Sequence, residues 1–141
     1  MRTPGLNIPT VDEATLAALV ARLRPFDPVV ELAVGRRPAV AAALAETNTV
    51  LATDRVDRPV PPGVNFVRDD LTAPDELLYA AAAALYALNL PEELQRPALE
   101  LAESVDVALA FTTLGNESPV VPVRRRETVP GETLFWVRGP D

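Results

Sequence analysis

Hydrophobic residues along this chain change their spacing several times, which divides it into short helices and strands. Leu16, Leu19 and Leu23 recur at helical spacing. The segments 29–34 and 105–112 are almost continuously apolar, as in strands buried on both faces of a parallel sheet. The pattern predicts helices at 11–24, 38–46, 75–79 and 91–103. It predicts strands at 29–34, 49–53, 64–68, 83–88, 105–112, 120–124 and 133–138.

The segment 75–90 supports two interpretations. It is rich in alanine, so intrinsic propensity favours one long helix. A parallel sheet instead requires a crossover and a fourth strand after the strand at 64–68. We therefore predict a short helix at 75–79 and a buried strand at 83–88.

A strand, a turn at Gly35, a helix and a second strand that ends at Asp54 form the pattern of a nucleotide-binding βαβ unit. Gly35 and Asp54 are 19 residues apart, near the spacing of about 20 expected in such units. An acid at the end of the second strand can accept hydrogen bonds from ribose hydroxyls. Ala33 and Arg37 stand where glycine is usual, and Pro38 removes one N–H donor from the start of the helix. A dinucleotide-binding motif would lack two of its three glycines here, which counts against that interpretation.

These elements predict an α/β fold, a Rossmann-like three-layer sandwich. Its sheet would be mostly parallel, with an antiparallel C-terminal hairpin at one edge, turning around Pro130-Gly131. We expect residues 1–10 to be a loose tail and residues 11–141 to form one domain. An exposed sheet edge can pair with a strand of another chain, so the sequence leaves open whether the protein forms a homodimer or binds a different protein.

Composition narrows the chemistry. The 141 residues include no cysteine and no histidine, which removes thiolate nucleophiles, imidazole bases and the usual zinc ligands. We expect no metal site. Twenty acids against 13 arginines, with no lysine, give a net charge of −7. This suits the cytoplasm of an extreme halophile, where salt screens self-repulsion and carboxylates keep an acidic protein hydrated. An ordinary acidic protein from a GC-rich genome is the alternative.

The same features bear on location and partners. No apolar run reaches the ~18 to 20 residues that cross a bilayer, and no apolar stretch follows Met1-Arg2. We therefore expect a cytoplasmic protein without a membrane segment. The negative net charge argues against nucleic-acid binding. The cluster 124–126 of three arginines could grip a phosphate, but pairing with Glu127 and Glu132 is the simpler interpretation.

Several motifs resemble those of S-adenosylmethionine-dependent methyltransferases with a Rossmann-like fold. The run 31–35 is similar to their first motif, and Asp54 to their ribose-binding acid. Asp69-Asp70-Leu71 resembles the loop in which an acid contacts the adenine amino group. Asn89-Leu90-Pro91 lies where amino-methyltransferases carry an Asn- or Asp-Pro-Pro-aromatic motif, although the second proline and the aromatic residue are missing.

The resemblance extends to a small uncharacterised archaeal family of truncated, methyltransferase-like Rossmann proteins, over about Val11 to Arg138. It is carried by the segments 31–40, 53–54, 66–70, 85–86, 91–95 and 134–136. The resemblance implies that S-adenosylmethionine, or another adenosyl or nucleotide ligand, binds at the carboxyl edge of the sheet. The residues it implies for this ligand are Glu31, Ala33, Gly35, Arg37, Asp54 and Asp70.

Arg37 would pair with the carboxylate of the ligand, and Asn89 is the candidate for orienting a methyl acceptor. Whether the chain is an enzyme stays open; if it is one, the resemblance implies a methyltransferase-like activity. The alternative is a non-enzymatic scaffold or interaction module with a decayed cofactor site. An open crevice beside Gly35, Asp54 and Asp70 would favour binding, whereas Arg37 folded against an acid would favour the scaffold.

The candidate residues also have structural interpretations. Glu31 and Asp54 could pair with one of the arginines 36, 37 and 55. Asp70 could form a turn or cap a helix, and Asn89 could cap the helix at 91–103. We expect Trp136 and Tyr86 to lie in the core.

Overall fold

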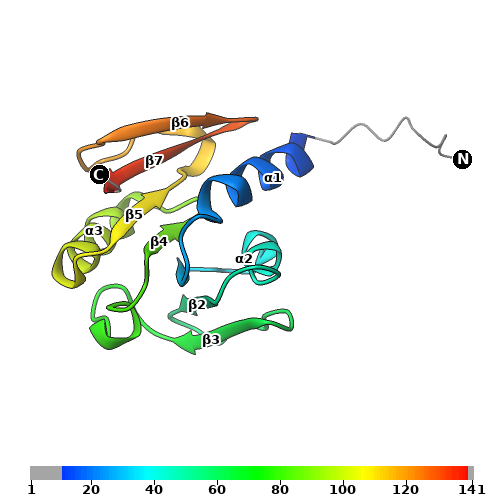
Figure 1. Cartoon of the computed structure of the whole chain (residues 1–141). Coiled ribbons are helices and arrows are strands. Elements are labelled where there is room, and N and C mark those ends of the chain that lie inside the picture. The colour runs from blue at the N-terminus through cyan, green and yellow to red at the C-terminus, as the bar shows by residue number, and fades with distance from the viewer. Residues whose placement is uncertain (1–10, 140–141) are drawn as a thin grey trace, which may run out of the picture.

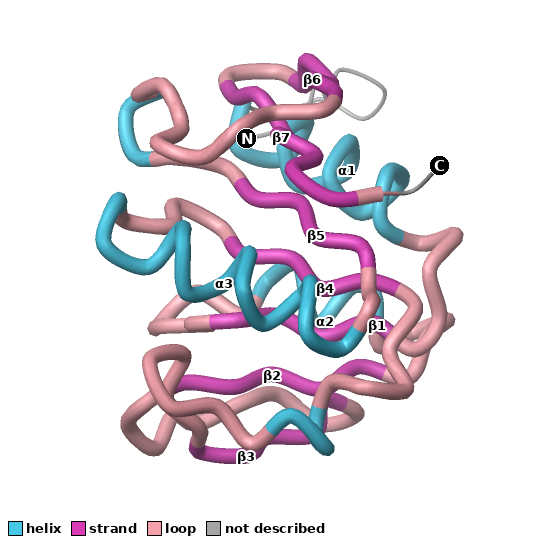
Figure 2. Tube along the Cα trace, turned by 90° about the vertical axis from the view of Figure 1, so that its left-hand side faces the viewer, coloured by secondary structure: helices cyan, strands magenta, loops and turns pink. Residues whose placement is uncertain are grey.

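A seven-stranded sheet organises the chain in the computed structural model, which describes residues 11–139. The strand order is β3-β2-β1-β4-β5-β7-β6, as Figure 2 shows from bottom to top. The four pairs from β3 to β5 are parallel, and β7 pairs antiparallel with β5 and β6. The strands are β1 (Val29–Leu32), β2 (Val50–Asp54), β3 (Val64–Arg68), β4 (Ala84–Ala87), β5 (Ala108–Phe111), β6 (Arg125–Val129) and β7 (Glu132–Arg138).

Helices cover both faces of this sheet, which confirms the predicted three-layer α/β fold. One face carries α1 (Val11–Leu23) and α2 (Ala39–Leu44), and the other carries α3 (Glu92–Val105) (Figures 1 and 2). The core accordingly forms two clusters of buried side chains, one on each face. The short 3-10 helices are η1 (Glu76–Leu78) and η2 (Leu114–Asn116). No helix in the described part of the chain is long and apolar enough to cross a membrane.

The ambiguous alanine-rich segment adopts the short-helix-then-strand arrangement. Asp75 begins η1 by accepting a hydrogen bond from the Leu77 backbone N–H, 3.2 Å away. β4 then lies between β1 and β5, and all four of its residues are buried. Burial of apolar side chains on both faces of the sheet outweighs the helical propensity of alanine, which amounts to less than about 1 kcal/mol per residue.

The C-terminal hairpin forms at the predicted sheet edge, but its first strand lies elsewhere. We predicted a strand at 120–124, which is wrong: β6 covers 125–129. The turn at Pro130-Gly131 brings Val129 directly opposite Glu132, so the pairing has to run back from that turn. Gly131 has φ 77°, which suits glycine at such a position. The predicted strand segment instead packs as a loop, in which Val121 is buried.

Trp136 anchors this hairpin in the core, as predicted. Its side chain is 1% exposed, and its ring centroid lies 5.2 Å from that of Phe26. The indole N–H donates to Glu127, which also forms ion pairs with Arg22 of α1 at 3.0 Å and with Arg125 at 3.4 Å. The predicted pairing of the arginine cluster with Glu127 is therefore confirmed for Arg125.

Candidate functional site

Two pockets open at the carboxyl edge of the sheet, on either side of the turn that follows β1. From β1 the chain passes through α2 to β2, and from β4 it passes through α3 to β5 on the opposite side. Ligands of open α/β sheets bind at this kind of topological switch point. The larger pocket has a volume of about 550 Å³ and the smaller about 80 Å³. Ala33 lines both.

The turn after β1 is tied to the end of β2 by two backbone donors. The Val34 N–H donates to the Thr53 carbonyl at 3.0 Å, and the Gly35 N–H donates to Asp54 Oδ2 at 2.9 Å. Ala33 and Gly35 have φ 52° and 61°. Alanine in this left-handed region costs about 1–2 kcal/mol, so the backbone keeps a glycine-like conformation although the glycine is missing. The turn and the acid predicted for the βαβ unit therefore lie in contact.

Asp54 pairs with an arginine that the sequence analysis did not choose. Its Oδ2 lies 3.3 Å from Arg58 Nε, and its Oδ1 accepts a hydrogen bond from the Val56 N–H at 3.3 Å. The predicted alternatives Arg36, Arg37 and Arg55 were wrong as partners, because the loop after β2 folds back and brings Arg58 over the carboxylate. Asp54 is 8% exposed and lines the smaller pocket.

Glu31 is buried beneath the larger pocket and bonds to a tyrosine. The Tyr86 hydroxyl donates to Glu31 Oε1 at 2.6 Å, and Glu31 is 1% exposed. Burial raises the pKa of Glu31 to about 8, and the Tyr86 hydrogen bond lowers it by a smaller amount. Pairing of Glu31 with an arginine was therefore a wrong alternative. Glu31 and Tyr86 lie opposite each other in the β1–β4 register, and this neighbouring position is the signal that could have identified the pair.

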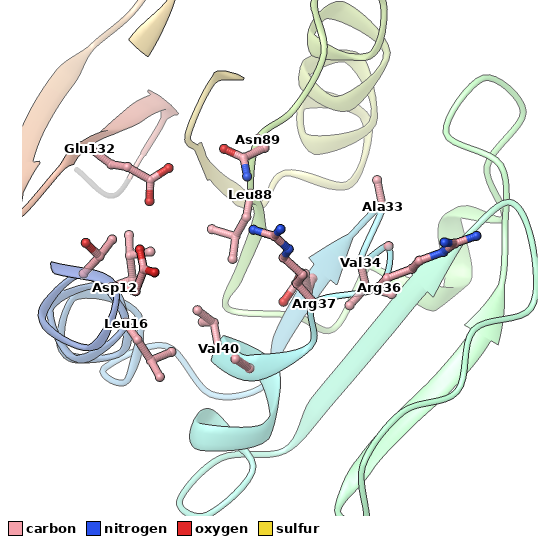
Figure 3. A pocket seen from close by; sticks show the side chains of 15 residues that line it. Asp12, Leu16, Ala33, Val34, Arg36, Arg37, Val40, Leu88, Asn89 and Glu132 are labelled. Carbon is pink, nitrogen blue, oxygen red and sulfur yellow. The ribbon is translucent and has the colours of Figure 1, made fainter. Parts of the chain in front are cut away.

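The two arginines of the turn leave the site open. Both are exposed, and neither forms an ion pair within residues 11–139. Both line the larger pocket, and Figure 3 shows Arg37 extending along Leu88, whereas the Arg36 side chain points away from Leu88. Arg37 is thus not folded against Glu31 or Asp54, which is the arrangement that favours binding over a scaffold.

The loop after β3 borders the smaller pocket with two aspartates. Asp70 Oδ1 accepts hydrogen bonds from the Thr72 N–H at 2.9 Å and hydroxyl at 2.8 Å, which lower the pKa of Asp70. Asp70 therefore forms a turn, as its structural interpretation predicted, and it also lines the pocket. Asp69 accepts hydrogen bonds from the Tyr79 hydroxyl and from the Asp75 N–H. Asp69 had no predicted role of its own, and no sequence pattern pointed to Tyr79.

Asn89 lines the larger pocket, but it does not cap a helix. Its φ is 51°, and its backbone N–H donates to Thr112 Oγ1 at 2.8 Å. Pro91 occupies the position before α3, so the predicted N-cap role is wrong. Asparagine tolerates the left-handed conformation better than most residues, which suits the bend between β4 and α3. No described residue hydrogen-bonds the Asn89 carboxamide, and Figure 3 shows it beside Leu88.

Sequence reasoning missed two acids of the larger pocket, Asp12 of α1 and Glu132 of β7. They are separated by more than a hundred residues, and no motif links them. Among residues 11–139 there is no group of three or more histidine, cysteine, aspartate or glutamate side chains that could hold a metal ion.

Comparison with protein families gives a match over most of the chain. The model of the "Uncharacterised protein family (UPF0146)" matches residues 14–139. A UPF0146 protein of the archaeon Halobacterium salinarum is 49% identical over 125 residues, which cover 88% of this chain and 95% of that protein. One from Archaeoglobus fulgidus is 41% identical over 78 residues, which cover 55% of this chain and 60% of that protein.

Solved structures with a similar fold include methyltransferases. Magnesium protoporphyrin IX methyltransferase from Synechocystis with bound SAH superposes with a TM-score of 0.60 at 16% identity. The match covers 92% of this chain and 84% of that one. An RNA methyltransferase from Salinibacter ruber in complex with S-adenosyl-L-homocysteine gives a TM-score of 0.57 at 16% identity, over 100% and 96% of the two chains. At these identities the likeness shows the fold.

Proposed function

The chain belongs to the archaeal protein family UPF0146, which has a methyltransferase-like Rossmann fold, and we propose that it binds S-adenosylmethionine or a related adenosyl ligand. The observation that carries this proposal is the open switch point itself. A pocket of about 550 Å³ meets a smaller one at Ala33, and the Asp54 carboxylate lies within hydrogen-bond distance of the same turn. The similar folds of methyltransferases with bound SAH support the choice of ligand.

Each candidate residue has a defined part in this site. Asp54 holds the ribose hydroxyls, and the turn at Ala33 and Gly35 lets the ligand approach the backbone closely. Asp70, beside Asp69 in the smaller pocket, accepts a hydrogen bond from the adenine amino group. The smaller pocket is too small to enclose a whole base, so the adenine lies partly on the surface.

The amino-acid end of the ligand lies in the larger pocket. Arg37 reaches into this pocket without an ion-pair partner among the described residues, so it is available to the ligand carboxylate. Glu31 lines the same pocket, and no described residue hydrogen-bonds its second oxygen, Oε2. Glu31 can therefore accept a hydrogen bond from the ligand ammonium group. If the chain transfers a methyl group, Asn89 is the residue placed to orient the acceptor.

Calorimetric titration with S-adenosylmethionine and S-adenosylhomocysteine, in molar KCl, tests this proposal. The Asp54→Asn variant keeps the size of the side chain and removes its charge. We expect it to bind about 10- to 100-fold more weakly, because a hydrogen bond to a charged group is worth ~1.5–3 kcal/mol. Asp57→Asn is the matched control, because Asp57 is exposed in the same loop and lines neither pocket.

Two outcomes would contradict the proposal. Folded wild-type protein that gives no saturable heat with either ligand would leave the non-enzymatic scaffold as the better account. Equal binding by wild-type protein and Asp54→Asn would show that the ligand lies elsewhere.

A further inference from the structure

The larger pocket extends well beyond the turn at Gly35, to the first helix and the C-terminal hairpin. Its outer wall includes Asp12 and Leu16 of α1 and Glu132 at the start of β7. The Thr15 hydroxyl donates to the Pro130 carbonyl and so joins α1 to the hairpin turn beside this wall. The outer half of the pocket is thus built from two segments that lie far apart in the chain.

Two carboxylates face each other across this outer half. Figure 3 shows Glu132 and Asp12 on the side of the pocket opposite Arg37. The Thr112 hydroxyl accepts the Asn89 N–H at 2.8 Å. Partial burial and the nearby charge of Asp12 both raise the pKa of Glu132, and the interaction of Thr112 with the Glu132 carboxylate lowers it by a smaller amount. No arginine within residues 11–139 forms an ion pair with either acid.

The wall between these acids and the turn is aliphatic. Its apolar members are Leu16, Leu19, Val40 and Leu88. On its floor lies the buried carboxyl of Glu31, whose Oε2 has no hydrogen-bond partner among the described residues. The outer half of the pocket therefore combines an apolar surface with the carboxylates of Asp12 and Glu132, neither of which forms an ion pair within residues 11–139.

We propose that this outer half binds an organic cation, namely a protonated aliphatic amine. Its ammonium group would lie between Asp12 and Glu132, and its carbon chain would pack on Leu16 and Leu88. A neutral ligand would leave the two carboxylates facing each other without a counter-charge, and an anion would be repelled. The whole larger pocket, of which this site is the outer half, has a volume of about 550 Å³, which lies in the range of pockets for small molecules. This site occupies the part of the larger pocket away from Arg37, and its test does not require the adenosyl ligand proposed above.

Three probes of equal chain length test the chemistry: n-hexylamine, 1-hexanol and hexanoate. Each is titrated into the ¹⁵N-labelled protein in molar KCl near neutral pH. We expect n-hexylamine to bind about tenfold more tightly than 1-hexanol, as expected for one partly desolvated charge pair. The amide signal of Leu16, on the wall away from Arg37, should shift with n-hexylamine, and hexanoate should leave the Leu16 signal unmoved.

Variants then separate the acids from the rest of the fold. Glu132→Gln and Asp12→Asn are nearly isosteric, and each should weaken n-hexylamine binding about three- to tenfold without changing 1-hexanol binding. Glu103→Gln is the matched control, since Glu103 is exposed on α3 at the other face of the sheet. Asp54→Asn should leave n-hexylamine binding unchanged, which distinguishes failure of this site from failure of the adenosyl site.

The proposal would be overturned if n-hexylamine bound no more tightly than 1-hexanol. It would equally be overturned if both acid variants, shown by their spectra to be folded, bound n-hexylamine as the wild-type protein does. Amide shifts confined to residues outside the larger pocket would place the amine elsewhere and have the same consequence.

Discussion

Replacing Glu31 by glutamine should make the protein more stable at neutral and alkaline pH. Glu31 is 1% exposed, and burial raises its pKa from 4.5 to about 8. Each pKa unit corresponds to about 1.4 kcal/mol, so the native state disfavours the charged form by about 5 kcal/mol. Glutamine has nearly the same shape and still offers Tyr86 an acceptor, but it does not titrate.

The sign of the pH dependence follows from proton binding. Between pH 4.5 and about 8, native Glu31 holds a proton that the unfolded chain has released. The contribution of Glu31 to stability is therefore fully present below pH 4.5 and is lost as the pH rises through about 8. The free energy of unfolding of the wild-type protein should fall, relative to Glu31→Gln, by about 1.4 kcal/mol per pH unit in this window.

Urea unfolding of both proteins in molar KCl, from about pH 5 to about pH 8, measures this difference. The free energy of unfolding of Glu31→Gln, relative to that of the wild-type protein, should rise by about 4 kcal/mol over that range. Contributions of all other titrating groups are common to both proteins and cancel. Glu103→Gln, at an exposed position, should show no such trend. A difference that stays constant across the range would refute the assignment of the raised pKa to Glu31.

Three further substitutions, one of them with a matched control, test other contacts of the structure. Tyr86→Phe removes the hydrogen bond that lowers the pKa of Glu31, so the same unfolding series should show its pH window displaced upward. Ala33→Gly should raise the free energy of unfolding by up to about 1 kcal/mol, because glycine adopts the left-handed conformation with φ 52° without the strain of alanine. Ala17→Gly, at an exposed position of α1, is the control and should lower the free energy of unfolding by about as much. Equal effects of the two substitutions would contradict backbone strain at Ala33. Tyr79→Phe should lower the free energy of unfolding by about 1–2 kcal/mol because Asp69 loses its hydroxyl donor, and an unchanged value would rule that bond out as a stabilising one.

The succession of strands, the mostly parallel sheet and its antiparallel C-terminal hairpin could be predicted from the sequence, because burial and turn chemistry agree along most of the chain. The βαβ pattern with its turn at Gly35 predicts that β1 and β2 are parallel neighbours. A parallel sheet also requires a crossover and a further strand after β3, which predicts β4 within the alanine-rich segment. The predicted position of β6 was wrong because the segment 120–123 is as apolar as a strand. The register is instead dictated by the turn at Pro130-Gly131.

The candidate site could be predicted only in part. Asp54 and Gly35 lie in contact because a motif of fixed spacing brings them together. The partners of Asp54 and Glu31 could not be predicted from the sequence. Arg58 contacts Asp54 because the loop after β2 folds back over the strand end, and Tyr86 bonds to Glu31 because β1 and β4 are neighbouring strands. Asp12 and Glu132 escaped notice because only the folded chain brings α1 beside the hairpin.

Mapping S-adenosylhomocysteine onto the ¹⁵N-labelled protein tests the central claim most directly. We expect saturable shifts at the amide of Gly35, which donates to Asp54, and at the amides of Asp70 and Leu71 beside the smaller pocket. The amide of Glu103 on α3 should not move. Shifts that follow this pattern and disappear in Asp54→Asn are the predicted result. Unchanged Gly35 and Asp70 signals at saturating ligand would contradict an adenosyl site at the carboxyl edge of this sheet.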